Sequence, residues 1–185
     1  MKQTWKPGTL LYPLPAVLVS CGTTEEPNAM TAAWTGTICS DPVMVYISLR
    51  PERYSYGIIE KNGEFVINLT TEKLAKATDW CGVKSGRDGN KFVQMHLTPE
   101  TSSQLSAPLI KESPVNIECK VEKIIPLGSH SMFIGRTLAV DVEETLLDSK
   151  GRLQLEKAHL LAYSHGEYFA LGRKLGTFGW TVRKK

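Results

Sequence analysis

Residues 113–146 read SPVNIECKVEKIIPLGSHSMFIGRTLAVDVEETL, and this stretch decides the fold class. Branched and aromatic residues recur on both sides of Pro126-Leu127-Gly128, which has the composition of a turn. The pattern predicts two long strands, from about Val115 to Ile125 and from His130 to Val142. A short turn between such strands makes them neighbours in an antiparallel hairpin.

Further strand-like segments precede this hairpin, and they are PAVLVS (15–20), AMTAAWTGTICS (29–40), VMVYISL (43–49) and EFVINL (64–69). The turn composition of CGTTEEPN makes the first two segments a hairpin. Segment 43–49 is apolar at nearly every position, which predicts a strand covered on both faces. One more short strand is expected within 167–180.

Two segments have helical character. The first follows Pro51 and ends at the Asn62-Gly63 turn, and the second is TTEKLAKATDW (70–80), expected to stop before Gly82. The glycine-rich stretch 81–92 is expected to be a loop. Five to seven strands with two helices predict a mainly β protein, an antiparallel barrel with peripheral helices. A length of 185 residues predicts one domain, 1–185.

Composition excludes several classes of protein. Hydrophobic residues make up 42% and charged residues 22%, as in soluble globular domains. The net charge of +3 includes the terminal Arg183, Lys184 and Lys185, but no long basic stripe with aromatics indicates nucleic-acid binding. No apolar window reaches the ~18 residues of a membrane span and no signal-type start is present, which predicts a cytoplasmic protein. The four scattered cysteines form no CxxC pair, so free thiols and no metal site are expected.

Familiar catalytic motifs are missing from the sequence. It contains no GxGxxG, no Walker loop, no GxSxG and no HExxH, and its four histidines show no metal-ligand spacing. These are His96, His130, His159 and His165. Each histidine taken alone is more typical of a surface or hydrogen-bonded residue than of a ligand.

Two segments carry groups suited to an anion. SLRPERYSY (48–56) places Arg50 and Arg53 between a strand end and a helix start, where guanidinium groups and free backbone N–H groups favour phosphate. SGRDGNK (85–91) adds Lys91 and glycines that let backbone amides approach an anion. The alternatives are a solvated arginine pair and an exposed mobile loop.

Five motifs in this order resemble the flavin reductase-like FMN-binding split-barrel proteins, and most closely their flavoredoxin subgroup, over about residues 13–179. The motifs are NAMTAAW (28–34), SLRPERYSY (48–56), FVINL (65–69), SGRDGNKF (85–92) and GSHSMFIG (128–135). The resemblance implies a split β-barrel of Greek-key type that forms a homodimer, with a non-covalent FMN near the subunit interface.

The resemblance also implies roles for individual residues. Along the isoalloxazine ring it places Asn28, Ala29, Met30 and Thr31, and beside the flavin it places Ser48, Leu49 and Arg50. Near the phosphate it places Ser55, Tyr56, Ser85, Gly86 and Lys91. His130 matches the histidine on the nicotinamide side of reductases of this family, which often carry an acidic residue where Ser129 stands here.

The expected function is therefore a flavoredoxin- or flavin reductase-type protein that moves hydride or electrons through FMN. It is either an NAD(P)H-dependent reductase or an electron carrier between redox proteins. A flavin-binding module without turnover is a further alternative. A haem barrel with His130 or His165 as axial ligand is disfavoured, because the arginine and lysine set fits a phosphate better.

Overall fold

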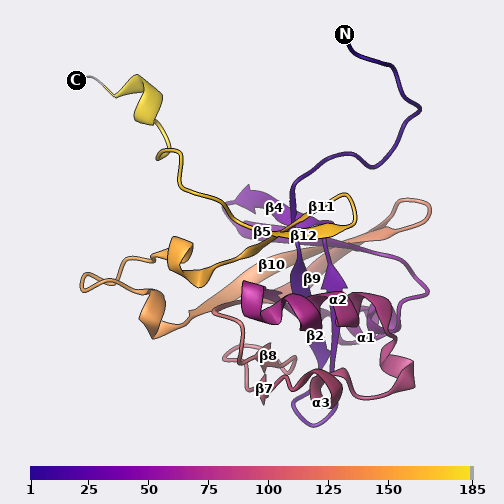
Figure 1. Ribbon diagram of the computed structural model, residues 1–185. Coiled ribbons are helices and arrows are strands. Elements are labelled where there is room, and N and C mark those ends of the chain that lie inside the picture. The colour runs from indigo at the N-terminus through magenta and orange to yellow at the C-terminus, as the bar shows by residue number, and fades with distance from the viewer. Residues whose placement is uncertain (184–185) are drawn as a thin grey trace.

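The computed structural model describes residues 1–183, so Lys184 and Lys185 of the expected basic tail lie outside the described residues. A seven-stranded antiparallel sheet forms the body of the protein (Figure 1). Its strand order is β3-β2-β6-β9-β10-β5-β4. Its strands are β2 (Val17–Gly22), β3 (Pro27–Ala32), β4 (Thr35–Ser40), β5 (Val43–Leu49), β6 (Glu64–Leu69), β9 (Val115–Pro126) and β10 (Ser131–Val142).

The long hairpin predicted from the sequence is confirmed as β9 and β10. Its register runs from Ser131 opposite Pro126 to Val142 opposite Val115, with irregularities after Ile134 and after Thr137. Such bulges increase the local twist of a strand and help a sheet to curl. Gly135 lies at the first irregularity, where a Cβ atom would come within 2.8 Å of the Phe65 ring, so the curled sheet needs a glycine there.

The sheet curls into a split barrel that is not closed. Strands β3 and β4 occupy opposite ends of the strand order and are not paired with each other within residues 1–183. The prediction of one continuous strand over 29–40 was therefore wrong. The chain bends at Ala33 and Trp34, leaves one edge of the sheet and joins the other.

The barrel interior is filled by its own side chains. Phe65, Phe133 and Ile47 are fully buried at its centre, with Val19 and Leu49 packed beside them. Burial of each such side chain contributes about 1.5–3 kcal/mol to folding. A barrel filled in this way leaves no interior room for a ligand.

Strand β5 is covered on only one face, contrary to the prediction of cover on both. Burial alternates along the strand: Val45, Ile47 and Leu49 are buried, whereas Met44 and Tyr46 are partly exposed. The apolar run of β5 therefore supplies the core on one side and leaves an apolar outer face on the other.

Three helices pack outside the sheet: α1 (Tyr54–Asn62), α2 (Ala75–Val83) and α3 (Lys91–Met95). Helix α1 ends at Gly63 with φ 69°, as the Asn62-Gly63 turn predicts. Helix α2 continues beyond the expected stop, because the N–H of Lys84 still donates to the carbonyl of Trp80 at 2.9 Å. Segment 81–92, expected to be a loop, holds the end of α2, a 3-10 turn at Gly86–Asp88 and the start of α3.

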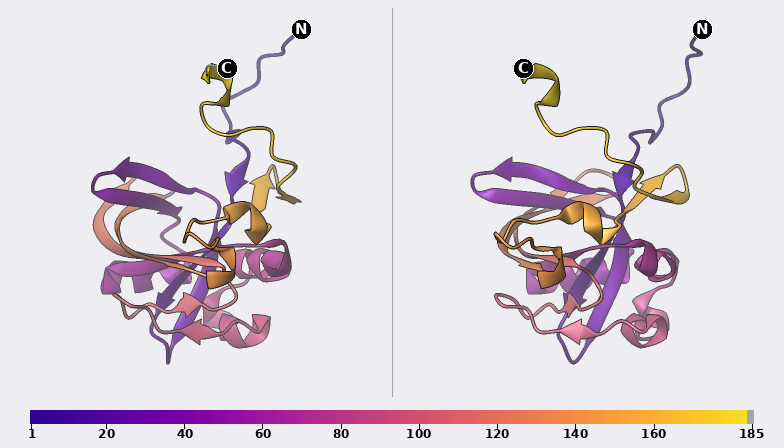
Figure 2. Two further views of the ribbon diagram at one scale, coloured as in Figure 1. Left: turned by 90° about the vertical axis from the view of Figure 1, so that its left-hand side faces the viewer. Right: turned by 60° about the vertical axis from the view of Figure 1, so that its left-hand side comes forward.

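Two small sheets and two extended termini complete the chain. Strand β1 (Leu14–Pro15) pairs with β11 (Leu161–Ser164), which pairs with β12 (Glu167–Ala170). Strands β7 (Pro99–Glu100) and β8 (Leu109–Ile110) pair separately. Both termini extend away from the body on the same side (Figure 2). None of the helices within residues 1–183 has the length and apolar character of a membrane span, and the four cysteines are free thiols, as predicted.

Candidate functional site

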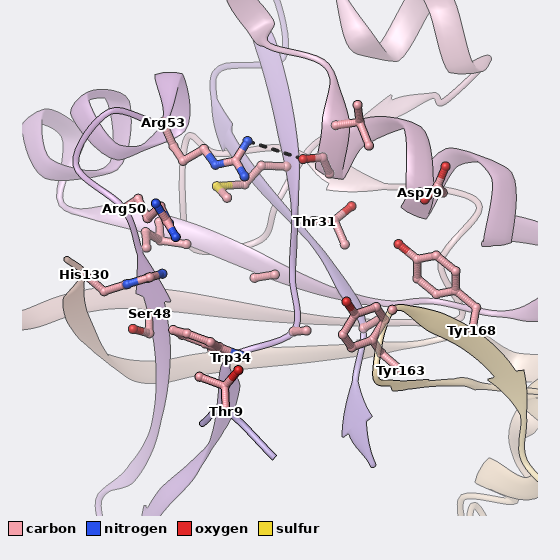
Figure 3. Close-up of a pocket in the computed structure, with 18 of the residues that line it drawn as sticks. Thr9, Thr31, Trp34, Ser48, Arg50, Arg53, Asp79, His130, Tyr163 and Tyr168 are labelled. Atoms are coloured by element: carbon pink, nitrogen blue, oxygen red, sulfur yellow. Dashed lines mark hydrogen bonds between the residues drawn. The ribbon is translucent and has the colours of Figure 1, made fainter. Parts of the chain in front are cut away.

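A cleft of about 480 Å³ lies outside the barrel, between the sheet, α2 and the small sheet β1-β11-β12 (Figure 3). This volume lies within the range of about 300–1,000 Å³ that is typical of small-molecule sites. Six of the residues predicted from the sequence line it, and they are Met30, Thr31, Ser48, Leu49, Arg50 and His130.

A second hollow of about 390 Å³, here called the cationic recess, continues from the cleft. The two hollows share Met30, Arg50, Arg53 and Gly82 in their walls. Four more of the predicted residues line the recess, and they are Ser55, Ser85, Gly86 and Lys91. The fold thus brings together the two segments that were predicted to bind an anion and that lie far apart in the sequence.

The cationic recess has a strong excess of positive charge. Its wall contains Arg50, Arg53, Lys84, Arg87 and Lys91, against the single carboxylate of Glu52. Glu52 lies 3.6 Å from Arg50, and both side chains are more than half exposed. Solvent screens such an exposed ion pair, so the Arg50–Glu52 pair contributes little to the stability of the fold. The remaining cations make the recess suited to a phosphate group.

Lys91 is the most unusual of these cations because it is buried. Its side chain donates to the carbonyl oxygen of Cys81 at 2.9 Å, and the residue is 3% exposed. Among residues 1–183 no carboxylate lies within ion-pair distance of its Nζ. Burial lowers the pKa of Lys91 below its usual value. A buried ammonium without a counter-ion is costly, and here it faces a hollow that an anion can enter.

Backbone groups add to the anion-binding character of the recess. The N-cap residue of α1, Arg53, makes no side-chain capping hydrogen bond. Tyr54 and Ser55, the first residues of this helix, line the recess, and the first N–H groups of a helix without such a cap are suited to an anion. The turn at Gly86 lies directly over α1: a Cβ atom on Gly86 would come within 2.5 Å of Cδ1 of Tyr54 and closer still to Oδ1 of Asn28. Only glycine fits this position without a shift of its neighbours.

The middle of the site is formed by β3 and α2 in close approach. The hydroxyl of Thr31 donates to the carbonyl oxygen of Thr78 on α2. A Cβ atom on Gly82 would lie 3.3 Å from Cβ of Thr31, so the small residue permits this approach. Met30 lies where the cleft and the recess meet. The result is a continuous path from the recess into the cleft.

His130 lies in the cleft, beside Trp34. The two rings are 4.5 Å apart with an interplanar angle of 37°, and Oγ of Ser129 lies 2.9 Å from Nδ1 of His130. Partial burial lowers the pKa of His130, and the positive charge of Arg50 adds to this effect. The lowered pKa favours the uncharged form of the imidazole.

Three predicted residues do not line the cleft or the recess. Strand alternation turns the side chain of Ala29 into the cluster beneath α2 and α3. Tyr56 follows Ser55 on α1 and points inward, where its ring packs 4.9 Å from that of Phe133 and its hydroxyl donates to Oγ of Ser131 at 3.1 Å. Asn28 lies behind the recess and supports it through Ser55.

Several lining residues were not predicted. Lys84 and Arg87 flank the glycine turn, so a count of charges along segment 81–92 would have indicated them. Asp79, Tyr163 and Tyr168 line the cleft without any local signal. The two tyrosines reach it only because the small sheet folds beside α2, which involves segments far apart in the sequence.

The fold and the site define a protein of the split-barrel flavin-protein class, and residues 9–172 match the family model of the flavin reductase like domain. The chain belongs to the flavin reductase-like family, and it is most like the flavoredoxin subgroup. Flavoredoxin of Desulfovibrio vulgaris (Miyazaki F) has a similar structure, with a TM-score of 0.91, 32% identity and coverage of 99% of this chain and 100% of that chain.

Two further relatives have informative names. An FMN-binding protein of Thermus thermophilus, solved with 1-cyclohex-2-enone bound, has a TM-score of 0.81 and 26% identity over 96% of this chain and 99% of its own. An NADH-dependent FMN reductase of Streptomyces nodosus subsp. asukaensis is 26% identical over 127 residues, which are 68% of this chain and 67% of that protein.

Proposed function

We propose that this protein binds FMN without a covalent bond and works as a redox protein. The observation that carries the proposal is the buried Lys91, which has no carboxylate partner within residues 1–183 and lies in a cationic recess that opens into a cleft of ligand size. The names of the flavoredoxin, the FMN-binding protein and the FMN reductase similar to this chain support FMN as the ligand.

The charges set the orientation of the ligand. The phosphate occupies the recess, where Lys91, Arg87 and the uncapped start of α1 provide charge-assisted hydrogen bonds. The isoalloxazine ring lies in the cleft along Met30 and Thr31, beside Ser48, Leu49 and Arg50. Bound FMN supplies hydride and electron transfer, and the chain supplies position, charge and shielding from water.

Within this proposal we favour NADH or NADPH as the electron donor. The relative named as an NADH-dependent FMN reductase supports this choice, and His130 lies at the cleft beside Trp34, where a donor has room to approach. An electron carrier without NAD(P)H activity is the alternative, and the two differ in whether either nucleotide reduces the bound flavin.

We also propose a homodimer that covers the cleft. The outer face of β5 and β10 is largely apolar, with Met44, Tyr46, Met132, Ile134, Leu138 and Val140 on it. The charged residue on this face of β10 is Arg136, which lies opposite Met44 and forms an ion pair with Glu122 at 2.8 Å. Leu138 is 40% and Val140 54% exposed. Ser48 lies on this same face and lines the cleft, so a second copy on the face also covers the cleft.

The charges of the termini favour a second copy of this chain as the partner that covers the outer face of β5 and β10. Residues 1–12 and 171–183 contain five basic residues, Lys2, Lys6, Arg173, Lys174 and Arg183, whereas all 19 acidic residues lie between 13 and 170. The termini extend away from their own body (Figures 1 and 2). Basic, aromatic termini of one copy are complementary to the acidic body of another.

Isolation of the protein tests the flavin proposal directly. The purified protein is expected to be yellow, and heat release with chromatography is expected to give FMN. Anaerobic addition of NADH and NADPH then shows whether the flavin is bleached. A folded protein that carries haem, or that takes up no flavin from added FMN, would contradict the proposal.

A further inference from the structure

The segment between α3 and β9, residues 98–113, covers the side of β6 and β9 that faces away from the barrel interior. We call this segment the strap, and it contains the short strands β7 and β8 (Figure 1). Glu64 of β6 accepts hydrogen bonds from the N–H groups of Ser106 and Ala107, both at 2.9 Å. Ala107 also packs on Val66 in a small buried cluster. The second half of the strap is thus fixed to the sheet by a carboxylate and by apolar contacts.

The first half of the strap is held by Glu118 of β9, which is fully buried. Its carboxylate accepts from the N–H and the hydroxyl of Ser103, both at 2.7 Å, and from the N–H of Gln104 at 2.8 Å. No cation within residues 1–183 forms an ion pair with Glu118. The attachment of Ser103 and Gln104 therefore depends on a buried carboxylate that has hydrogen-bond donors but no counter-ion.

Asp141 of β10 is a second carboxyl group at this place. The register of β9 and β10 puts Asp141 opposite Asn116, which is two residues from Glu118 and on the same side of the strand. Its Oδ2 atom is buried and has no hydrogen-bond partner among residues 1–183. Burial raises the pKa of Asp141, and the negative charge of Glu118 adds to this shift. Ionised Asp141 would place an uncompensated charge beside the carboxylate that holds the strap.

Two further charged groups lie near this carboxyl pair. Glu100 of β7 belongs to the strap, and its negative charge also raises the pKa of Asp141. Lys120 of β9 lies opposite Glu64, on the same side of the sheet as Glu118. It forms no ion pair with any carboxylate within residues 1–183. The neighbours that act on Asp141 are therefore acidic, and they favour its protonated form.

We propose that Asp141 and Glu118 form a pH-sensitive latch for the first half of the strap. With a proton on Asp141, this residue can donate to Glu118, the pair carries one negative charge and the strap is held. When Asp141 gives its proton to water, two neighbouring carboxylates repel each other, and the bonds from Ser103 and Gln104 open. The latched state keeps the proton to a higher pH than the released state. Release therefore increases as the pH rises above the ordinary aspartate pKa of about 3.9.

The end of the strap near β8 is held by groups that do not titrate. The N–H of Ile110 donates to Oδ1 of Asn68 at 3.0 Å. The Ile110 side chain packs with Cys81 of α2 and Phe92 of α3, in the cluster beneath these helices. Opening of the latch therefore frees the residues near Ser103, while the contact with α2 and α3 remains. The latch needs no ligand in the cationic recess.

Hydrogen exchange of the Ser103 and Gln104 amides, followed by NMR from pH 4 to 8, tests the latch. Protection is measured relative to free amides at each pH. We expect a fall of about fivefold with rising pH, the scale of one partly exposed charge pair. Its midpoint should coincide with the titration of the Asp141 carboxyl carbon, and the Ile110 amide should keep its protection. Constant protection of Ser103 and Gln104 across the Asp141 titration would overturn the proposal.

Variants separate the charge of Asp141 from its shape. Asp141→Asn cannot ionise and is expected to keep the protection of the acid form from pH 4 to 8. Glu100→Gln retains Asp141 but removes a neighbouring negative charge, so the fall in protection should move to lower pH. Asp88→Asn makes the same chemical change on an exposed turn and should behave as the wild type. A fall that persists in Asp141→Asn, or an unchanged midpoint in Glu100→Gln, would overturn the latch.

Discussion

Asn28 donates a hydrogen bond from Nδ2 to Oγ of Ser55 at 2.7 Å, and both residues are buried. This bond joins β3 to the start of α1 directly behind the cationic recess. Gly86 lies against the same asparagine, with no room for a Cβ atom. The shape of the recess therefore depends on three segments that meet at Asn28.

Gly86→Ala is expected to weaken FMN binding by at least about tenfold, the equivalent of one lost charged hydrogen bond. The added Cβ clashes with Asn28 and the Tyr54 ring, so the turn moves away from the recess. Fluorescence titration with FMN measures the change. Gly57→Ala is the control, because a Cβ there has nothing within 4 Å and lies in α1. That control should bind FMN normally and gain about 0.5–1 kcal/mol in stability. Normal FMN affinity in Gly86→Ala would show that the turn does not shape the site.

Lys91→Met is expected to weaken FMN binding by roughly 10- to 100-fold, as expected for a charged hydrogen bond of about 1.5–3 kcal/mol. Binding of riboflavin, which lacks the phosphate, is expected to change little. Lys84→Met is the control, since Lys84 lines the same recess but is exposed. Equal losses for FMN and riboflavin would place Lys91 near the ring instead of the phosphate.

The Lys91→Met substitution is also expected to stabilise the protein in its flavin-free form. Burial lowers the pKa of Lys91 in the folded state, so the unfolded chain holds this proton to a higher pH than the folded chain. Stability attributable to Lys91 therefore rises with pH between the lowered pKa and the ordinary value of about 10.4, and the burial cost is complete below that window. Urea unfolding of wild type and Lys91→Met at several pH values measures the difference. A difference in unfolding free energy between wild type and Lys91→Met that grows with rising pH would contradict this account.

His130→Ala is expected to retain FMN and to slow its reduction by NADH or NADPH. The side chain lies at the cleft beside Trp34 and does not reach the recess. Because the pKa of His130 is lowered, chiefly by burial, its charge changes only below the usual histidine range of about 6.5. Stopped-flow reduction from pH 7 to 8 should thus show a constant ratio of wild-type to variant rates. Loss of FMN in the variant would instead make His130 a binding residue.

Val140→Lys is expected to shift the protein from dimer to monomer. The new charge lies on the largely apolar outer face of β10, beyond the end of its pairing with β5, where a second copy would bury it. Val93→Lys is the control, because Val93 on α3 is 70% exposed and lies on another element. Sedimentation of both variants, with and without FMN, measures the proportions of monomer and dimer. If FMN binds the dimer, adding it favours the dimer and dilution releases it. A wild type that stays monomeric with FMN bound at every concentration would remove the dimer proposal.

The sequence by itself determined the elements whose signals are local. The β9–β10 hairpin, the end of α1 at Gly63 and the mainly β class follow from periodicity and turn composition, which act between close neighbours. The cationic, glycine-rich character of segments 48–56 and 85–91, which favours phosphate, was also readable from the sequence, because it belongs to the residue types themselves.

Only the tertiary structure decided how these elements meet. It divided 29–40 between two sheet edges, turned Ala29 and Tyr56 away from the cleft and buried Lys91 beneath α2. It also brought Tyr163 and Tyr168 opposite Trp34 and His130. The physical reason is that burial and pairing depend on contacts between segments far apart in the chain. Local residue patterns do not specify which surface a side chain will face once those segments pack.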